Sequence, residues 1–448
     1  MTFKGAVLCI CSLHLESFFT AQLIFQTSSK QMNSQRKNMP AFANQQTYDL
    51  FAPEALVNSY PLYKRMREED PVHYCESLGY WILTRYRDVE AALRDERLSV
   101  DRTALYINQL GNLDVKQIQN FLHLVSKMMV EKDPPDHTQL RKLANQGFTT
   151  RALESWRSII QNTTDQLLDN VQNHGCMNVV SDLSIPLPTL ILTQIFGVPE
   201  TDRANFIKWA MDISTFFGVL GGSNIEEFAR KADLAAAQFS ALIRQLVEER
   251  RRQPGTDMIS LLTVAYEEQG FNLEELPSQC IMILNAGLLT TTDQISNGVN
   301  ALLRHPDQLQ KLKKNPTLIN SAVEEIIRFD TSVPFFFRIA KQDLTIGGKN
   351  ITAGSVIALG LGAANHDPQK FDSPEVFDIT RSPNEHLGFG SGIHFCLGAV
   401  LARMELTICL ATLLRRLPNL SFAPDQQAIP TKHTSLIFKG FDSLPVKF

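Results

Sequence analysis

A ten-residue segment near the C-terminus constrains this chain more than any other part of its sequence. Residues 389–398 read FGSGIHFCLG, so three glycines surround one cysteine, Cys396. Glycines allow the backbone to turn tightly and to approach a flat ligand closely. A helix-forming stretch starts directly afterwards at Ala399, and the free N–H groups and positive dipole end of a helix stabilise a thiolate. A cysteine on its own is more often a small buried hydrophobic residue, but this setting favours a metal ligand.

The same segment resembles the haem-binding loop of the cytochrome P450 family, Phe-x-x-Gly-x-His-x-Cys-x-Gly, at every defining position. The resemblance implies that Cys396 is the axial iron ligand of haem b, and that Phe389 and Gly398 belong to the cofactor loop. It also implies the family's fold, which is mainly α with small β-sheets in a single large haem-binding domain. The implied activity is that of a monooxygenase, which is an oxidoreductase.

Two further segments are similar to motifs of this family. Glu325 and Arg328 match its Glu-x-x-Arg helix motif, and Arg381 ends a stretch that resembles the segment completing a Glu–Arg–Arg network. Residues three apart share a helix face, so Glu-x-x-Arg alone is typical of a surface ion pair. Its order and spacing relative to the cysteine loop favour the family interpretation, in which the network has a structural role.

A haem carries two propionates, and a site that buries them needs cationic donors. His137 and Arg141 lie four residues apart on an expected helix and match the family's His-x-x-x-Arg pair. Arg338 and His394 match its other propionate contacts, and arginine and histidine are both suitable donors to carboxylates. Any one of the four residues is equally typical of a surface or capping role, but together they fit one dianionic ligand. His386 is expected to be structural.

The long amphipathic stretch from about residue 273 to 303 predicts one helix of about 45 Å. Its middle resembles the family's oxygen-binding segment, in which Ala286 and Gly287 leave room for dioxygen and Thr290 offers a hydroxyl group. Taken alone, Thr290 is also typical of a threonine that bonds back to a helix carbonyl.

The sequence departs from the family in this helix, because Leu289 stands where an Asp or Glu is usual. Leucine cannot relay the protons that cleavage of the O–O bond requires. Asp293 follows Thr290 by about one turn and is a candidate substitute, although a helix-surface role fits it better. Water or a substrate group is a further alternative.

Substrate contacts are placed by region, at positions that resemble the family's substrate walls. These regions are 101–130, the stretch 206–224 with Trp209, Phe216 and Phe217, and the strand expected at 333–337. A strand alternates its side chains, so the three consecutive phenylalanines of that strand cannot all line one pocket. Residues 218–222 (GVLGG) predict a mobile loop at the entrance. The candidate pocket residues are Leu288, Val333, Phe335, Phe336 and Phe337.

The chain of 448 residues is 44% hydrophobic, and no linker or internal repeat divides it. We therefore expect a single domain at residues 39–448, preceded at 1–38 by an extension that is disordered or is not part of the native start. A net charge of −4 does not suit a nucleic-acid or membrane-surface binder. Seven scattered cysteines without zinc-finger spacing favour a cytoplasmic protein.

The leading hypothesis is a bacterial-type haem-thiolate monooxygenase that inserts one oxygen atom from O2 into a hydrophobic or amphipathic small molecule in specialised metabolism. The resemblance implies a ferredoxin or flavodoxin as electron donor, and we expect a monomer. Leu289 keeps a second hypothesis open, in which the same fold uses peroxide, reduces a nitrogen oxide, or catalyses rearrangement or coupling. A third hypothesis is a non-catalytic haem sensor or docking protein.

Overall fold

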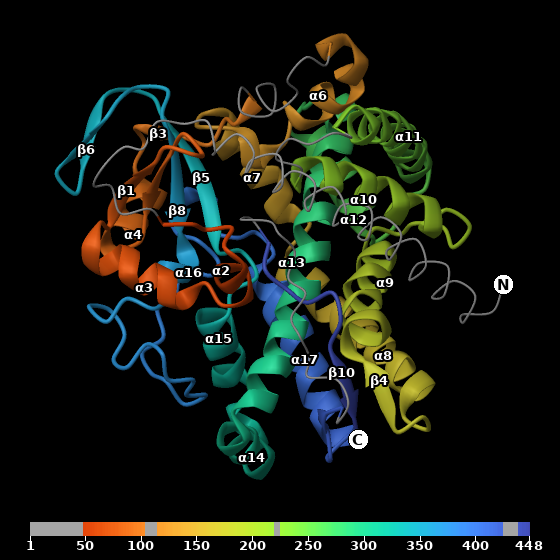
Figure 1. Ribbon diagram of the computed structural model, residues 1–448. Helices are drawn as coiled ribbons and strands as arrows, with labels where there is room; N and C mark the ends of the chain where they lie inside the picture. The colour runs from red at the N-terminus through yellow and green to blue at the C-terminus, as the bar shows by residue number, and fades with distance from the viewer. Residues whose placement is uncertain (1–47, 104–113, 219–224, 424–437) are drawn as a thin grey trace. The chain divides into compact units, whose positions relative to one another are not determined.

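The computed structural model describes residues 48–103, 114–218, 225–423 and 438–448. The predicted extension at 1–38 lies outside the described residues, as does most of the loop predicted at 218–222. The described chain is mainly helical with three small β-sheets, as the sequence predicted (Figure 1). No helix among the described residues is both long and apolar enough to cross a bilayer.

The α-helices are α2 (Pro53–Val57), α3 (Tyr60–Glu69), α4 (Tyr86–Arg94), α6 (Gln119–Val125), α7 (Asp136–Gln146), α8 (Thr150–Val171), α9 (Pro186–Ile195), α10 (Arg203–Gly218), α11 (Ile225–Arg252), α12 (Met258–Glu268), α13 (Leu276–Arg304), α14 (Pro306–Lys314), α15 (Ile319–Phe329), α16 (Leu361–Ala364) and α17 (Ala399–Arg416). The strands are β1 (Val72–Cys75), β2 (Tyr80–Leu83), β3 (Leu98–Ser99), β4 (Cys176–Asn178), β5 (Phe335–Ala340), β6 (Leu344–Ile346), β7 (Lys349–Ile351), β8 (Val356–Gly360), β9 (Ser421–Phe422) and β10 (Pro445–Lys447).

The described residues form two compact units. The first contains residues 101–147 and 193–285, and the second contains residues 50–100, 148–192 and 286–448. A single domain at 39–448 remains a prediction.

Helix α13 follows the predicted long helix to within three residues at each end. A 3-10 turn at Leu273–Glu275 precedes it, and the Asn272 side chain caps that turn by accepting the N–H of Glu274. Pro277 occupies the second position of the helix, where its missing N–H costs no intrahelical hydrogen bond. The cap and the proline together explain why the helix begins here.

The largest sheet has the strand order β1-β2-β8-β5-β3 and belongs to the second unit. Strands β2 and β8 are parallel, whereas β5 runs antiparallel to β8 with Phe337 opposite Ala358. Successive side chains of a strand point to opposite faces, so Phe336 lies on one face of the sheet while Phe335 and Phe337 lie on the other.

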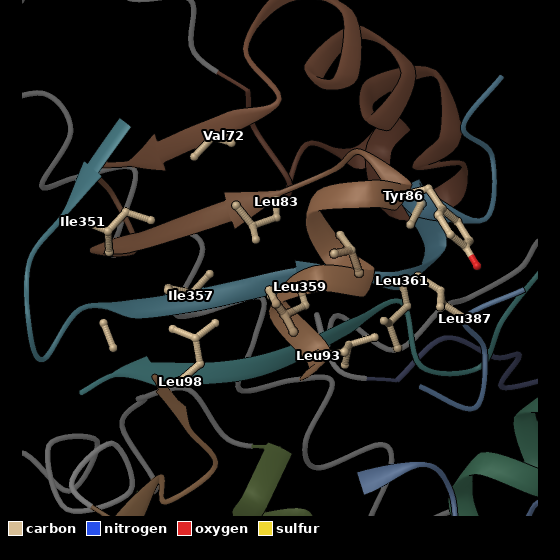
Figure 2. Close-up of a cluster of buried hydrophobic side chains, with 14 of the residues drawn as sticks. Val72, Leu83, Tyr86, Leu93, Leu98, Ile351, Ile357, Leu359, Leu361 and Leu387 are labelled. Carbon is tan, nitrogen blue, oxygen red and sulfur yellow. The ribbon is translucent and has the colours of Figure 1, made fainter. Parts of the chain in front are cut away.

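A hydrophobic cluster packs on one face of this sheet under helix α4 (Figure 2). The helix contributes Tyr86, Val89 and Leu93, which recur at helical spacing, and the strands contribute residues such as Leu83 and Leu359. Each fully buried side chain of this size stabilises the fold by about 1.5–3 kcal/mol. The cluster also contains Leu387, and it therefore anchors the start of the loop that carries the cysteine motif.

Candidate functional site

The cysteine loop is held by backbone hydrogen bonds directly ahead of α17. The Gly390 N–H donates to the Leu387 carbonyl at 2.8 Å, and the Cys396 N–H donates to the Phe389 carbonyl at 3.0 Å. Cys396 is half-buried and lies three residues before Ala399, the first residue of α17. The sulfur therefore lies near the N-terminal end of an 18-residue helix, where an anion is favoured.

Different physical reasons favour glycine at the three glycine positions of the loop. Gly390 and Gly392 have φ angles of 70° and 74°, a backbone conformation that strains other residues. Gly398 has a φ of −84°, and a Cβ added there would meet no atom within 4 Å. Neither conformation nor internal packing requires glycine at position 398, so this position suits a ligand that approaches the backbone closely.

The middle of α13 presents an accessible stripe that belongs to the second unit. Ala286 is exposed although it lies well inside a 29-residue helix, and Leu289 and Thr290 are half-buried. The Thr290 hydroxyl donates to the Ala286 carbonyl, four residues earlier in the same helix, at 2.6 Å. The sequence analysis named such a hydrogen bond as the alternative interpretation of this threonine. A Cβ added at Gly287 would lie 3.1 Å from the Leu192 side chain, so this face of the helix is closely packed.

The surface role expected for Asp293 is wrong. Its side chain is only 2% exposed, and a Cβ added at Gly440 would overlap its carboxylate. Helix periodicity did not reveal this burial because the segment 438–441, which lies against the helix here, is distant in sequence. Leu288, a predicted pocket residue, is likewise buried at 3% exposure.

Two of the predicted propionate donors belong to the first unit. His137 and Arg141 lie four residues apart on α7, where His137 is buried and Arg141 is half-buried. Burial lowers the pKa of His137, and the positive charge of Arg141 lowers it further. His137 therefore favours the neutral form, which can still donate one hydrogen bond.

The other two predicted donors belong to the second unit, together with Cys396. Arg338 lies on β5 with 2% exposure, and its guanidinium group donates to the Phe337 carbonyl at 3.0 Å and lies 5.3 Å from the Phe336 ring centroid. His394 is half-buried and ends a short 3-10 helix, Gly392–His394, within the cysteine loop.

The structure brings the three residues of the predicted Glu–Arg–Arg network together. Arg328 donates to both carboxylate oxygens of Glu325 at 2.8 and 2.9 Å, and Arg381 Nε lies 3.2 and 3.3 Å from the same two oxygens. Arg328 also donates to the carbonyls of Asn365 and Pro374. The network thus ties α15 to the segment that leads to the cysteine loop.

The candidate pocket aromatics differ in their surroundings. Phe335 contacts the Tyr63 ring at 5.5 Å and Phe337 contacts the Tyr80 ring at 5.8 Å, and both are buried. Phe336 packs against the hydrophobic cluster under α4, and Val333 is half-buried. Phe335, Phe336 and Phe337 therefore have the contacts of core residues.

The aromatic residues predicted near 206–224 lie on α10. Phe216 is buried and packs edge-on against Phe121 with ring centroids 4.8 Å apart, whereas Trp209 is half-buried. The side chain of Phe217 lies outside the part of the chain that the structure describes. Phe216 is therefore a core contact of the first unit.

Sequence reasoning missed Glu324 and Arg403. The Arg403 guanidinium donates to both carboxylate oxygens of Glu324 at 2.6 and 2.9 Å, and His386 Nε2 lies 3.1 Å from one of them. The only sequence signal for Glu324 is its place beside Glu325. His386, which was expected to be structural, contacts the carboxylate of this ion pair.

Comparisons with known proteins agree on one family. The profile of the family described as Cytochrome P450 matches residues 111–441. The chain is 39% identical over 398 residues to the biotin biosynthesis cytochrome P450 of Bacillus subtilis, covering 88% of this chain and 97% of that protein. It is 35% identical over 408 residues to the 6-deoxyerythronolide B hydroxylase of Saccharopolyspora erythraea, covering 89% and 98%.

Solved structures give the same result. The crystal structure of P450BioI in complex with hexadec-9Z-enoic acid-ligated acyl carrier protein superposes with a TM-score of 0.79 at 38% identity, covering 88% of this chain and 99% of that chain. The crystal structure of CalO2 superposes with a TM-score of 0.82 at 30% identity, covering 90% and 98%.

Proposed function

Because this chain belongs to the cytochrome P450 family, it is a monooxygenase with haem b as its cofactor, and we propose that Cys396 is the axial iron ligand. Its proposed reaction inserts one oxygen atom from O2 into a hydrophobic or amphipathic small molecule. Haem b held by a thiolate supplies the oxygen-activating chemistry. The position of Cys396 ahead of α17 is the observation that carries the proposal.

The chain's own residues fit a flat macrocycle with a thiolate ligand. The α17 N-terminus favours the anionic form of Cys396, and Gly398 leaves room beside the backbone. Ala286 and Thr290 provide an accessible stripe with one hydroxyl group on α13. His137, Arg141, Arg338 and His394 are the proposed donors to the propionates.

Thr290 is the proposed hydrogen-bonding residue on the oxygen-binding side. Its hydroxyl hydrogen is directed to the Ala286 carbonyl, so its oxygen can accept a second hydrogen bond from a reactant or from water. Leu289 offers no proton beside it. We therefore propose that a water molecule or a substrate group, held by a hydrogen bond to Thr290 Oγ1, supplies the protons.

A spectroscopic experiment tests the axial ligand. Carbon monoxide bound to the reduced, purified full-length protein should give the thiolate-type Soret shift, and Cys396→Ala should abolish it. The exposed Cys176 on β4 provides the matched control, because Cys176→Ala should leave the spectrum unchanged. A histidine-type spectrum in the unsubstituted protein would contradict the proposal.

Leu289 supports a second candidate, in which the same fold works with peroxide, with a nitrogen oxide, or by rearrangement or coupling. Turnover with a ferredoxin or flavodoxin donor should be compared with turnover driven by peroxide. Leu289→Asp adds an ionisable group, and Leu289→Asn is its matched control of similar size. Better coupling of electron use to product in Leu289→Asp alone would show that the missing acid matters, whereas no change would show another proton route. Absence of product under every regime would support a haem sensor or docking protein.

The substrate class to test first is a long-chain acyl group. One similar structure holds an acyl chain ligated to acyl carrier protein, and a 39% identical relative is named for biotin biosynthesis. We propose that this chain accepts an amphipathic acyl substrate, either free or linked to a carrier. Titration of the haem spectrum with a free fatty acid and with the same acyl chain on a carrier protein distinguishes the two forms, and a spectrum unchanged by either form would contradict an acyl substrate.

A further inference from the structure

A second charged cluster lies beside the Glu–Arg–Arg network, on three separate parts of the second unit. Glu324 on α15 accepts two hydrogen bonds from Arg403 on α17, at 2.6 and 2.9 Å, and a contact of 3.1 Å from His386 in the loop. Burial alone raises the pKa of Glu324, but the hydrogen bonds from Arg403 and His386 outweigh burial and hold that pKa at about 2. The cluster therefore contains an ionised carboxylate across the neutral pH range.

Arg403 also contacts the cysteine loop through an aromatic ring. Its guanidinium carbon lies 4.4 Å from the centroid of the Phe389 ring, a distance at which a cation and a ring face attract each other. The backbone carbonyl of the same Phe389 accepts the Cys396 N–H at 3.0 Å. A continuous series of contacts thus runs from Glu324 through Arg403 and Phe389 to Cys396.

The bidentate ion pair fixes the plane of the guanidinium group. An arginine fork on a carboxylate restricts rotation more than a single contact does, and the side chains of Arg403 and Glu324 are only 35% and 28% exposed. The His386 ring lies 5.9 Å from the Phe389 ring, and His386 Nδ1 accepts the Gly388 N–H at 3.2 Å. Phe389 therefore contacts two side chains, those of Arg403 and His386, that both lie against the Glu324 carboxylate.

We propose that Arg403 and Glu324 are positioning residues that hold Phe389, and with it the Cys396 backbone, and that their opposite charges set the reduction potential of the thiolate site. This inference rests on the proposed function, because it takes Cys396 as the iron ligand. In this proposal Arg403 and Glu324 act through Phe389 and not through contact with the substrate.

The two charges have opposite expected effects. A nearby positive charge stabilises an added electron, and a negative charge disfavours it. Arg403→Gln leaves the carboxylate without its guanidinium partner and should lower the midpoint potential. Glu324→Gln leaves the guanidinium charge uncompensated and should raise it. Arg403→Lys keeps the charge but loses the planar fork, so the potential should stay near that of the unsubstituted protein while the loop loosens.

The experiment is an anaerobic spectroscopic redox titration of the haem-loaded full chain and its variants. Arg416 on the same helix is the matched control, since it pairs with Asp165 and Asp169 on α8. We expect opposite shifts of the midpoint potential for Arg403→Gln and Glu324→Gln, both larger than the shift for Arg416→Gln. Shifts of the same sign, or shifts no larger than the control, would overturn the inference.

A second measurement covers variants that load haem poorly. Hydrogen exchange of residues 387–397 in the haem-free full chain should accelerate in Arg403→Lys and not in Arg416→Lys. Equal exchange in these two variants would overturn the positioning role. The carbon monoxide spectrum of the unsubstituted protein separates failure of the proposed function from failure of the positioning role. If this spectrum lacks the thiolate-type shift, the proposed function fails. If the shift is present but the variants show no change in potential or in hydrogen exchange, only the positioning role is rejected.

Discussion

The Arg328 guanidinium donates hydrogen bonds to both carboxylate oxygens of Glu325, at 2.8 and 2.9 Å, and neither side chain is exposed to solvent. An ion pair this deeply buried costs desolvation energy, so its net contribution depends on complete hydrogen bonding. Arg328 satisfies that condition through the carbonyls of Asn365 and Pro374. The pair is therefore sensitive to any substitution that removes donors, even one that preserves charge.

Arg328→Lys should destabilise the fold by about 3–5 kcal/mol, as is typical when a buried pair is broken. Lysine keeps the positive charge but cannot reach two carboxylate oxygens and two carbonyls from one flat group. Denaturant unfolding of the haem-loaded protein measures the loss. The exposed Arg415 is the control, because Arg415→Lys should change stability by less than about 0.5 kcal/mol. Equal losses in the two variants would show that a lysine side chain in place of Arg328 retains the essential contacts.

Gly440→Ala should destabilise the protein by about 1–3 kcal/mol through overpacking. The added methyl group overlaps the Asp293 carboxylate, and the adjacent Lys439 is fixed by hydrogen bonds with Ser332 and Asn297. Gly362→Ala is the control, because its methyl group would meet only ordinary contacts at 3.5 Å.

A double-mutant cycle with Asp293 tests whether the overlap causes the loss of stability in Gly440→Ala. If the overlap with Asp293 is responsible, Gly440→Ala should cost less in an Asp293→Ala background than alone. Strict additivity of the two substitutions would show that the overlap is not the source of the loss. Thermal unfolding of the four proteins provides the free energies for the cycle.

Glu405 on α17 gives the fold a distinct pH dependence. Burial raises the pKa of this carboxyl group from 4.5 to about 8. The stabilising effect of the neutral group is complete below about pH 4.5 and is lost as the pH rises towards 8, because only the unfolded chain ionises in this window. Stability should fall by up to about 1.4 kcal/mol per pH unit there.

Glu405→Gln should remove this dependence and stabilise the protein most at pH 8. Denaturant titrations at several pH values between 5 and 8 measure the difference, and the exposed Glu76→Gln serves as the control. A difference between Glu405→Gln and the parent protein that does not grow with pH would contradict a neutral Glu405.

Local patterns predicted much of the architecture. The amphipathic stretch at about 273–303 located α13 to within three residues at each end. The alternation of a strand also predicted that the three phenylalanines of β5 divide between two faces. These features depend on neighbouring residues, so the sequence contains the information that determines them.

Contacts between distant segments were not predictable in the same way. Glu324 and Arg403 are 79 residues apart in the chain, and their helices alone give no sign that they meet. Asp293 was expected at the surface, since helix spacing does not show which segment covers a helix face. The Glu325 network was expected only through a family resemblance, because Glu-x-x-Arg by itself is typical of an exposed pair.

Thr290→Ala should separate electron consumption from product formation. The substitution removes the hydroxyl group, whose oxygen is proposed to accept a hydrogen bond from the group that supplies protons. The backbone of the helix should stay unchanged. Because positioned proton transfer contributes roughly 10²–10⁴-fold, product formation should fall about 10²-fold while electron consumption continues. Thr290→Ser keeps the hydroxyl and should retain most of the coupling. Product yield per electron measures the effect, and equal yields in the two variants would assign the proton route to another group, with the buried Asp293 as the next residue to substitute.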